Sequence, residues 1–169
     1  MMNQAALRTA VRVGAIAGAL CVAWVLMLYL TDQNPYGPKR LMTVFVPPIA
    51  VLVAQWSARK LATDQFGFLV ALMTGVVTLL ITASLSGLGV YTLARVGNPK
   101  LIEQNRAQMK KMIQAERANF LKEKGGKEQY ERSLSGIAST PADLAQDDFN
   151  KKLLAGLFFF LPGAIFFRR

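Results

Sequence analysis

Hydrophobic residues in this chain are gathered into four uncharged blocks, at residues 13–31, 41–58, 65–94 and 153–167. In a soluble domain such residues would be dispersed with the period of an amphipathic helix or strand. A membrane-spanning helix needs roughly 20 mostly apolar residues to cross about 30 Å of hydrocarbon, and the first three blocks meet or approach that length. The pattern therefore predicts an all-α fold, a polytopic membrane helical bundle with four transmembrane helices at about residues 13–30, 41–56, 66–93 and 153–167.

The predicted connections differ greatly in length. Short turns join the first three spans, and the first turn contains Pro35 and Pro38, so these spans should be antiparallel neighbours. A helical extramembrane segment, residues 96–152, lies between the third and fourth spans. We therefore expect a single membrane domain over residues 1–169, with this segment as its one sizeable part outside the bilayer.

The first span carries two glycines four residues apart, Gly14 and Gly18. Small residues at this spacing let two helix backbones approach closely in lipid, and the partner helix could belong to a second copy or to the same chain. We favour packing within the chain, because four spans supply their own partners. Cys21, the single cysteine, lies in the same span and is interpreted as a small apolar filler.

The second span is interrupted near its centre by Pro47 and Pro48. Each proline lacks an amide hydrogen, so carbonyl groups one turn earlier lose their partners and the helix should bend. Broken helices often line transport sites, but prolines are also tolerated in membrane helices that have no such role. We favour a static kink over a functional hinge.

The third span shows two stripes with a period of four residues. One is a stripe of small residues for helix packing, broken by Leu79, and the other is a hydroxyl stripe that is a candidate polar path. Small residues favour close helix contact, whereas Thr and Ser in lipid usually bond to the carbonyl group four residues earlier, so we favour packing over conduction. The small stripe comprises Gly67, Ala71, Gly75, Ala83 and Gly87, and the hydroxyl stripe comprises Thr74, Thr78, Thr82 and Ser86.

The extramembrane segment is predicted to begin with a long amphipathic helix. Asn98 and Pro99 are residue types favoured at an N-cap and at the first helical position, and the helix should continue to about Lys124. Its apolar residues recur on one face and charges fill the other, which is typical of an amphipathic helix. The face that we interpret as a candidate partner surface carries Met109, Met112, Ile113 and Phe120.

A second short helix is predicted over residues 127–134, and a third should begin at a capping box formed by Thr140-Pro141-Ala142-Asp143. This third helix should run on into the last span.

The last span is short for a bilayer, so the basic residues at its two ends should reach outward towards the headgroups. We interpret Asp147 and Asp148 as solvated residues of a helix start that complement its dipole, rather than as metal ligands. The basic residues concerned are Lys151, Lys152, Arg168 and Arg169.

The composition excludes several kinds of chemistry. The net charge is +10, but many of the basic residues lie at span ends, where they anchor helices to phosphate headgroups, so we expect no nucleic-acid partner. There is no histidine, which removes most metal sites and catalysis by Ser-His or Cys-His pairs. No Asp, Glu, Lys or Arg falls within a predicted span, whereas ion-coupled transporters normally carry such residues there. We expect no enzyme, cofactor or metal site.

The charges of the short loops predict an orientation. An even number of spans places both termini on one side, and the short-loop count is six basic residues on that side against two on the other. Basic residues in short loops are retained in the cytoplasm, so both termini are predicted to be cytoplasmic. The six residues are Arg8, Arg12, Arg59, Lys60, Arg168 and Arg169, and the two are Lys39 and Arg40.

The order of these features resembles one known family. Arg59-Lys60 is followed closely by Gly67 at the start of the third span, and then by Asn98-Pro99-Lys100-Leu101-Ile102-Glu103, an amphipathic helix and a Phe-rich last span. This order resembles the four-span bacterial membrane family called domain of unknown function 4199, over nearly the whole chain. The resemblance implies the four-span fold and a place in the bacterial inner (cytoplasmic) membrane, and it implies no activity. Pro47-Pro48 departs from the pattern.

Two functional hypotheses remain. The favoured one is a non-enzymatic accessory or scaffold subunit whose extramembrane helix contacts the lipid bilayer, another membrane protein or a second copy of the chain. The alternative is a small oligomeric transporter or channel that uses the hydroxyl stripe and the Pro47-Pro48 bend.

Overall fold

The structure, a computed structural model, describes residues 4–62, 66–122 and 125–167. Four long helices in these residues are apolar enough to cross a membrane, which confirms the predicted all-α bundle of four spans. The chain is therefore a multi-pass integral membrane protein. The spans are α1 (Gln4–Leu30), η1 (Pro38–Phe45) continued by α2 (Val46–Leu61), α3 (Phe68–Val96) and α7 (Pro141–Phe167). Arg168, Arg169 and Lys124, which the sequence analysis used, lie outside the described residues.

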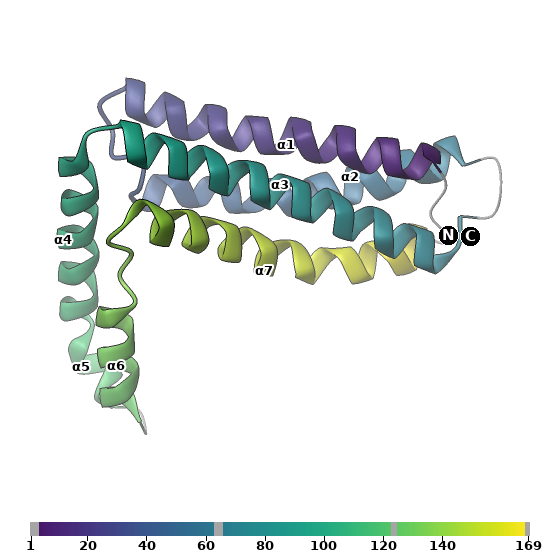
Figure 1. Ribbon diagram of the computed structural model, residues 1–169. Coiled ribbons are helices and arrows are strands. Elements are labelled where there is room, and N and C mark those ends of the chain that lie inside the picture. Colours follow the sequence, from purple (N-terminus) through teal and green to yellow (C-terminus); the bar gives the residue numbers. More distant parts are fainter. Residues whose placement is uncertain (1–3, 63–65, 123–124, 168–169) are drawn as a thin grey trace.

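The α3 helix is the centre of the bundle. It packs against α1, α2 and α7, while α2 also packs against α1 and α7. In the described residues α1 and α7 make no contact with each other, so they lie on opposite sides of the α2–α3 pair (Figure 1). The start of α1 and the end of α7 lie at one end of the bundle, and the loop between α1 and η1 lies at the other end (Figure 1).

A helical arm leaves the bundle at the end opposite the termini. It consists of α4 (Pro99–Ala115), α5 (Arg117–Phe120) and α6 (Gly126–Ser135). The arm projects sideways, across the direction of the bundle helices, and returns to α7 as a hairpin (Figure 1). If the bundle stands upright in a bilayer, the arm extends along the membrane surface. We use "arm" for residues 99–135 and "arm end" for this end of the bundle.

The start of α4 is as predicted, but its end is not. The Asn98 side chain accepts a hydrogen bond from the Lys100 amide, and Pro99 occupies the first turn. The helix then ends at Ala115 instead of continuing to about Lys124, because Glu116 leaves helical geometry with φ −88° and ψ 2°. This break lets the chain fold back, so that Phe120 stacks edge-on against Tyr130 of α6.

The prolines of the second span do not kink a helix. The segment before them is a 3₁₀-helix, η1, and Pro47 and Pro48 then occupy the first turn of α2. First-turn amide groups have no partner within their helix, so prolines cost little there. The predicted central kink was therefore wrong, and the span is longer than the predicted 41–56.

The last span is the second part of a longer helix, as the sequence predicted. The α7 helix is continuous over 27 residues from Pro141, and it starts at the predicted capping box. The Asp143 amide donates to Thr140 Oγ1 at 3.1 Å, while Asp143 Oδ2 accepts from the Thr140 amide at 2.9 Å. The helix thus runs on through the charged turns into residues 153–167, as predicted, and these turns pack within the bundle.

Glycines set the spacing between α1 and α3. A side-chain carbon added at Gly14 would lie 2.9 Å from the Thr78 carbonyl oxygen, and one at Gly18 would lie 2.7 Å from Leu85 Cβ. Both glycines are buried. The glycine pair of the first span therefore faces α3 of the same chain rather than a second copy.

The small residues of α3 face α2 and α7. Ala71 and Ala83 are fully buried, and Gly75 lies against Gln55 and Phe160. Leu79, which breaks the stripe, fills the space left by Gly156 of α7. A larger residue on one helix thus fits a glycine on the other.

The two ends of this stripe behave differently. A side-chain carbon added at Gly87 would lie 3.3 Å from the Ala145 carbonyl oxygen of α7. Gly67 has no atom within 4 Å of such a carbon, so its assignment to the helix-packing stripe was wrong. Gly67 serves as the extended N-cap of α3 instead.

Candidate functional site

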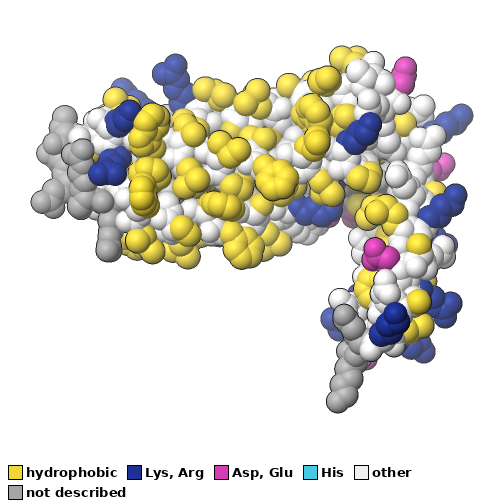
Figure 2. All heavy atoms as spheres, turned by 180° about the vertical axis from the view of Figure 1, so that it is seen from behind, with side chains coloured by type: hydrophobic (Ala, Val, Ile, Leu, Met, Phe, Trp, Pro, Cys, Tyr) yellow, Lys and Arg dark blue, Asp and Glu magenta, His cyan; other side chains and the backbone are white. Residues whose placement is uncertain are grey.

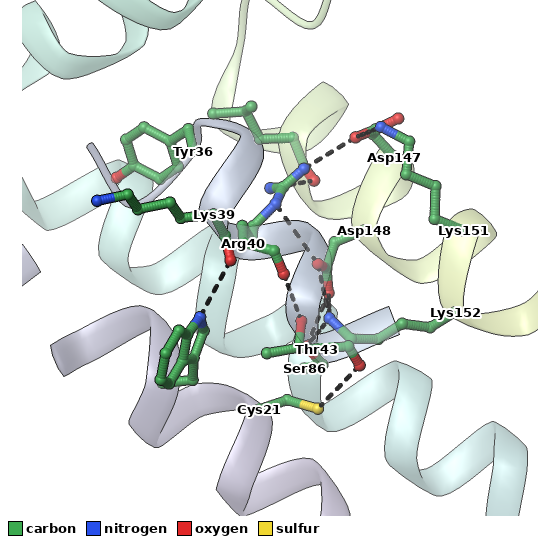
Figure 3. Close-up of polar contacts among 12 residues, drawn as sticks. Cys21, Tyr36, Lys39, Arg40, Thr43, Ser86, Asp147, Asp148, Lys151 and Lys152 are labelled. Atoms are coloured by element: carbon green, nitrogen blue, oxygen red, sulfur yellow. Dashed lines mark hydrogen bonds and ion pairs between the residues drawn. The ribbon is translucent and has the colours of Figure 1, made fainter. Parts of the chain in front are cut away.

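A cluster of charged side chains lies inside the arm end of the bundle. Three elements contribute to it: η1, α3 and α7 (Figure 3). We call it the charged cluster, and it comprises Arg40, Ser86, Asp147, Asp148, Lys151 and Lys152.

The inner half of the cluster is a closed hydrogen-bonded triad. Lys152 Nζ lies 2.7 Å from both carboxylate oxygens of Asp148 and donates to Ser86 Oγ at 2.7 Å. The Ser86 hydroxyl in turn donates to Asp148 Oδ2 at 2.7 Å. Lys152 is 0% exposed and Asp148 is 3% exposed, so the triad is sealed from solvent and lipid.

The outer half of the cluster is centred on Arg40. Its Nη2 atom donates to Asp147 Oδ2 at 2.8 Å, and its Nε atom lies 3.7 Å from Asp148 Oδ1. Lys151 Nζ also donates to Asp147 Oδ2, at 2.8 Å. Arg40 is buried, whereas Asp147 and Lys151 are 34% and 43% exposed at their side chains. The cluster thus runs from the bundle interior to its surface.

The spacing of residues on α7 produces this arrangement. Positions four residues apart lie on one face of a helix, so Asp148 pairs with Lys152 towards the interior and Asp147 pairs with Lys151 further out. Ser86 lies about 15 Å along the α3 axis from Val96, at 1.5 Å per residue, which places the triad well below the end of the bundle.

The structure therefore corrects two expectations. Asp148 is not a solvated residue of the first helical turn, and Lys152 does not reach outward to headgroups. The Asp148–Lys152 pair lies just before the predicted span 153–167, in the same helix and inside the bundle. A charge buried alone is very costly. Ser86 makes burial tolerable by hydrogen bonding to both members of the Asp148–Lys152 pair, and the Arg40 guanidinium adds an ion pair to Asp148, with Nε 3.7 Å from Oδ1.

Arg40 likewise differs from its expected role at the membrane surface. Its side chain points inward to α7 and carries only 4% exposure. Neighbouring groups fix the η1 turn that places it: the Thr43 hydroxyl donates to the Arg40 carbonyl oxygen at 2.8 Å, and the half-buried Trp24 indole donates to the Lys39 carbonyl oxygen at 3.2 Å. Cys21 Sγ approaches the Thr43 carbonyl oxygen at 3.9 Å, beside the cluster (Figure 3).

The hydroxyl stripe of α3 has two different parts. Thr74, Thr78 and Thr82 each donate to the carbonyl group four residues earlier, at 2.7–2.8 Å, and all are fully buried. Their hydroxyl groups are thereby satisfied within the helix. Ser86 alone turns to the charged cluster. The stripe therefore forms one polar site at its arm end and a packed seam elsewhere.

A buried glutamine bridges three helices nearer the other end of the bundle. Gln55 of α2 is 0% exposed, and its Nε2 atom donates to the carbonyl oxygens of Ala71 on α3 and Phe160 on α7, at 3.1 and 3.0 Å. Gly75 and Gly163 leave the space for this side chain. The sequence analysis did not single out Gln55, although it is the one amide residue in that apolar helix.

The candidate partner face of α4 is turned towards the rest of the chain. Met109 and Ile113 are half-buried, and together with Met112 they line a cavity between the arm and the bundle. Phe120 is half-buried against Tyr130. Only Met112 among these four residues is mainly open, at 49% exposure.

The buried phenol of Tyr36 lies beside the cluster, in the loop before η1. Burial raises the pKa of Tyr36 to about 12, and the Tyr29 phenol adds to this shift while the Arg40 guanidinium opposes it. The phenol therefore remains protonated throughout the physiological range. Its oxygen has no hydrogen-bond partner among the described residues.

The contacts within the cluster are ion pairs and hydrogen bonds. In the described residues no three His, Cys, Asp or Glu side chains gather in a way that could hold a metal ion. Three cationic and two anionic side chains leave the cluster with one net positive charge. Ionisable residues within membrane spans commonly mark functional sites, so the cluster is the first candidate site in this bundle.

Part of this site could have been found from the sequence. The four-residue spacing of Asp147 with Lys151 and of Asp148 with Lys152, directly before a span too short for the bilayer, is a signal that these turns lie inside the membrane. Arg40 could not be assigned in this way, because nothing in its local sequence distinguishes it from a headgroup anchor.

Comparison with known proteins gives a family but no activity. No curated protein and no solved structure matches the chain significantly. The family model described as Protein of unknown function (DUF4199) matches residues 12–169, nearly the whole chain. With the four-span bundle, this match confirms the resemblance seen in the sequence: the chain belongs to the DUF4199 family of proteins of unknown function.

Proposed function

We propose that this protein is a non-enzymatic accessory or scaffold subunit of the bacterial inner membrane, whose arm docks an acidic surface of another membrane protein. In this proposal both termini lie in the cytoplasm, and the arm lies at the opposite face of the membrane. The observation that carries the proposal is the combination of a closely packed bundle with a projecting arm whose basic residues Arg106, Lys110 and Lys111 are exposed in the described part of the chain.

The bundle interior supports a structural role. At the α1–α3 and α3–α7 interfaces, side chains of one helix pack against glycines of the other. The threonine hydroxyl groups donate to carbonyl groups of their own helix. Close packing of this kind favours a structural role for the centre of the bundle.

The charge of the arm supports an acidic partner. Nine Lys or Arg residues and five Glu residues lie between Gly97 and Thr140. On α4 the buried positions face the bundle, whereas Arg106, Lys110 and Lys111 are exposed. Complementary charge favours encounter and orientation between two proteins, so an acidic surface fits this face.

The test is crosslinking in native membranes followed by purification of the tagged full chain. We expect a specific crosslinked protein with the wild type and its loss with the variant Arg106→Glu/Lys110→Glu. The matched control is Arg8→Glu/Lys60→Glu, which reverses two exposed charges at the opposite end of the bundle. Recovery of the chain alone, or equal crosslinking by wild type and arm variant, would contradict the proposal. Substitution of Met109, Met112 and Ile113 is less suitable, because these residues line an internal cavity.

A small transporter or channel is the second candidate, and the buried charged cluster is the observation that favours it. Ion-coupled transporters place such residues within their spans. This candidate predicts solute or ion flux in liposomes that Asp148→Asn or Thr78→Leu abolishes in correctly folded protein. Absence of flux for protons, Na⁺, K⁺ and small anions would remove it.

A further inference from the structure

A cavity of about 190 Å³ lies between the arm and the arm end of the bundle. Five parts of the chain surround it: the loop before η1, η1 itself, the inner face of α4, the end of α6 with the segment after it, and the first turns of α7. Arg40, Asp147 and Lys151 form its charged side. Figure 2 shows basic and hydrophobic side chains meeting at this inner corner between bundle and arm.

The cavity is amphipathic and lies where the apolar bundle meets the charged arm. Opposite the charged groups its walls are apolar, formed by Met109, Ile113 and Leu144. Leu41 also lines it and is 44% exposed, next to Met42 at 65% exposure on the outer surface of η1. These exposed residues belong to a membrane span, so the cavity borders the lipid.

The charge of the lining favours an anion. Arg40 and Lys151 together outweigh Asp147 by one unit, because Asp148 and Lys152 neutralise each other behind them. Lys151 Nζ uses one of its donors on Asp147 at 2.8 Å. An ammonium group has three donors, and the 43% exposure of this side chain leaves the others accessible to a ligand.

A second feature indicates a hydroxyl donor on the ligand. Asn105 lines the cavity, is 5% exposed, and its Oδ1 atom has no hydrogen-bond partner among the described residues. A buried acceptor without a partner is costly. An amide oxygen can only accept, so its missing partner must be a donor such as a hydroxyl group.

We propose that this cavity binds the headgroup of a phospholipid that carries one negative charge and a free hydroxyl group, of the phosphatidylglycerol type. The phosphodiester accepts hydrogen bonds from Lys151, the headgroup hydroxyl donates to Asn105 Oδ1, and the acyl chains lie along the exposed hydrophobic surface of η1. Basic pockets at the ends of membrane helices bind anionic headgroups in this way. The site does not depend on the partner docking proposed above.

The experiment is native mass spectrometry of the full chain in mild detergent, with lipids of identical acyl chains. We expect phosphatidylglycerol to bind at least fivefold better than phosphatidylethanolamine or phosphatidylcholine. Lys151→Gln should weaken phosphatidylglycerol binding about fivefold to tenfold, as for the loss of one charge-assisted hydrogen bond. Lys110→Gln, which removes an exposed lysine of α4 outside the cavity lining, should leave binding unchanged.

Three results would overturn the proposal. Equal binding of phosphatidylglycerol and phosphatidylethanolamine would show that the site selects neither charge nor hydroxyl group. Equal losses in Lys151→Gln and Lys110→Gln would indicate general attraction to a basic protein. Displacement of the lipid by equimolar soluble glycerol phosphate would assign the cavity to a soluble phosphate ester instead. A thermal-melting scan of each variant checks that it is folded, and crosslinking of the arm variant reports separately on the partner hypothesis.

Discussion

Asp148 contacts the residues whose burial costs the most free energy, the charged side chains inside the bundle. It lies between the Lys152 ammonium and the Arg40 guanidinium, with Ser86 as a third donor. Burial of a charge pair costs several kcal/mol of desolvation for each ion, and the pair is tolerated only when its geometry and hydrogen bonds are complete. The stability of the arm end should therefore depend strongly on this one carboxylate.

Replacement of that carboxylate provides the first prediction. Asp148→Asn leaves Lys152 buried without its counter-ion, while Arg40 keeps Asp147, so we expect the free energy of unfolding to fall by about 3 kcal/mol. The double variant Asp148→Asn/Lys152→Met should recover part of the loss, because it also removes a buried charge. Unfolding of the purified protein in detergent measures both values. The control Glu103→Gln removes an exposed carboxylate, and an equal loss there would contradict the explanation.

Tyr36 gives a prediction about pH. Its pKa of about 12 lies above the ordinary value of 10.0 expected in the unfolded chain, so folding favours the protonated phenol. The corresponding stability is complete below pH 10 and is lost as the pH rises through 12. An absorbance titration of the folded protein should show one of the four tyrosines ionising near pH 12, and Tyr36→Phe should remove that step. A titration in which all four ionise near pH 10 would disagree with its burial.

At the scale of elements, the contact between α1 and α3 depends on small residues. In lipid there is little hydrophobic drive between helices, so association relies on close packing. Gly14, Gly18 and Gly89 lie at this interface, and an added carbon at any of them meets backbone or stiff side-chain atoms of the other helix. The helices therefore approach through positions where no larger residue fits.

We predict that Gly18→Ala destabilises the bundle by about 1–3 kcal/mol, the usual cost of overpacking. The added carbon would lie 2.7 Å from Leu85 Cβ, which cannot move without the α3 backbone. Gly67→Ala is the matched control, since a carbon there meets no atom within 4 Å and φ is −66°. Thermal unfolding in one detergent compares the two, and equal melting temperatures would contradict the packing described for α1 and α3.

The arm shows how a local break decides the use of a helix face. An uninterrupted helix beyond Ala115 would carry Phe120 away from the bundle and leave its apolar face open to a partner. The chain instead breaks at Glu116 and reverses between α5 and α6, so that α6 returns beside α4 and Phe120 packs on Tyr130. The apolar face of α4 is consequently directed to the chain itself, and its charged face is directed outward.

At the scale of the whole molecule, the arm and the termini lie at opposite ends of the bundle (Figure 1). They should therefore lie on opposite sides of the membrane. In a Cys21→Ala background, single cysteines at Lys110 and at Lys60 should react with a membrane-impermeant maleimide from opposite faces. With cytoplasmic termini, only the arm cysteine is labelled in intact spheroplasts, and the other reacts after lysis. Labelling of both cysteines from one face would contradict the four-span topology.

Much of the fold could be predicted from the sequence, because a bilayer makes strong and local demands. The uncharged blocks predicted the four long helices. The capping residues Asn98, Thr140 and Asp143 correctly predicted where two helices begin. The wrong predictions concern local sequence patterns that are compatible with two different structures. Pro47 and Pro48 can kink a helix or begin one, and the 3₁₀ segment before them decided the second.

The site was predictable only in part. The hydroxyl stripe singled out Ser86 in the sequence. Its partners, Asp148 and Lys152, lie 62 and 66 positions further along the chain. Whether a lysine near a span end reaches outward or inward depends on the presence of a counter-ion across the bundle. The Lys151 side chain points partly outward, and the Lys152 side chain points inward.

The sequence by itself determined that the chain spans a membrane four times as an all-α bundle. The free energy of placing a segment in lipid depends mainly on the charges of that segment, so each span can be recognised separately. Only the tertiary structure decided which charges are buried, since Arg40 and Asp147 meet across more than 100 positions of chain and pair only when η1 and α7 pack together. Tertiary packing also decided where the arm's apolar face points and so created the cavity beside the cluster.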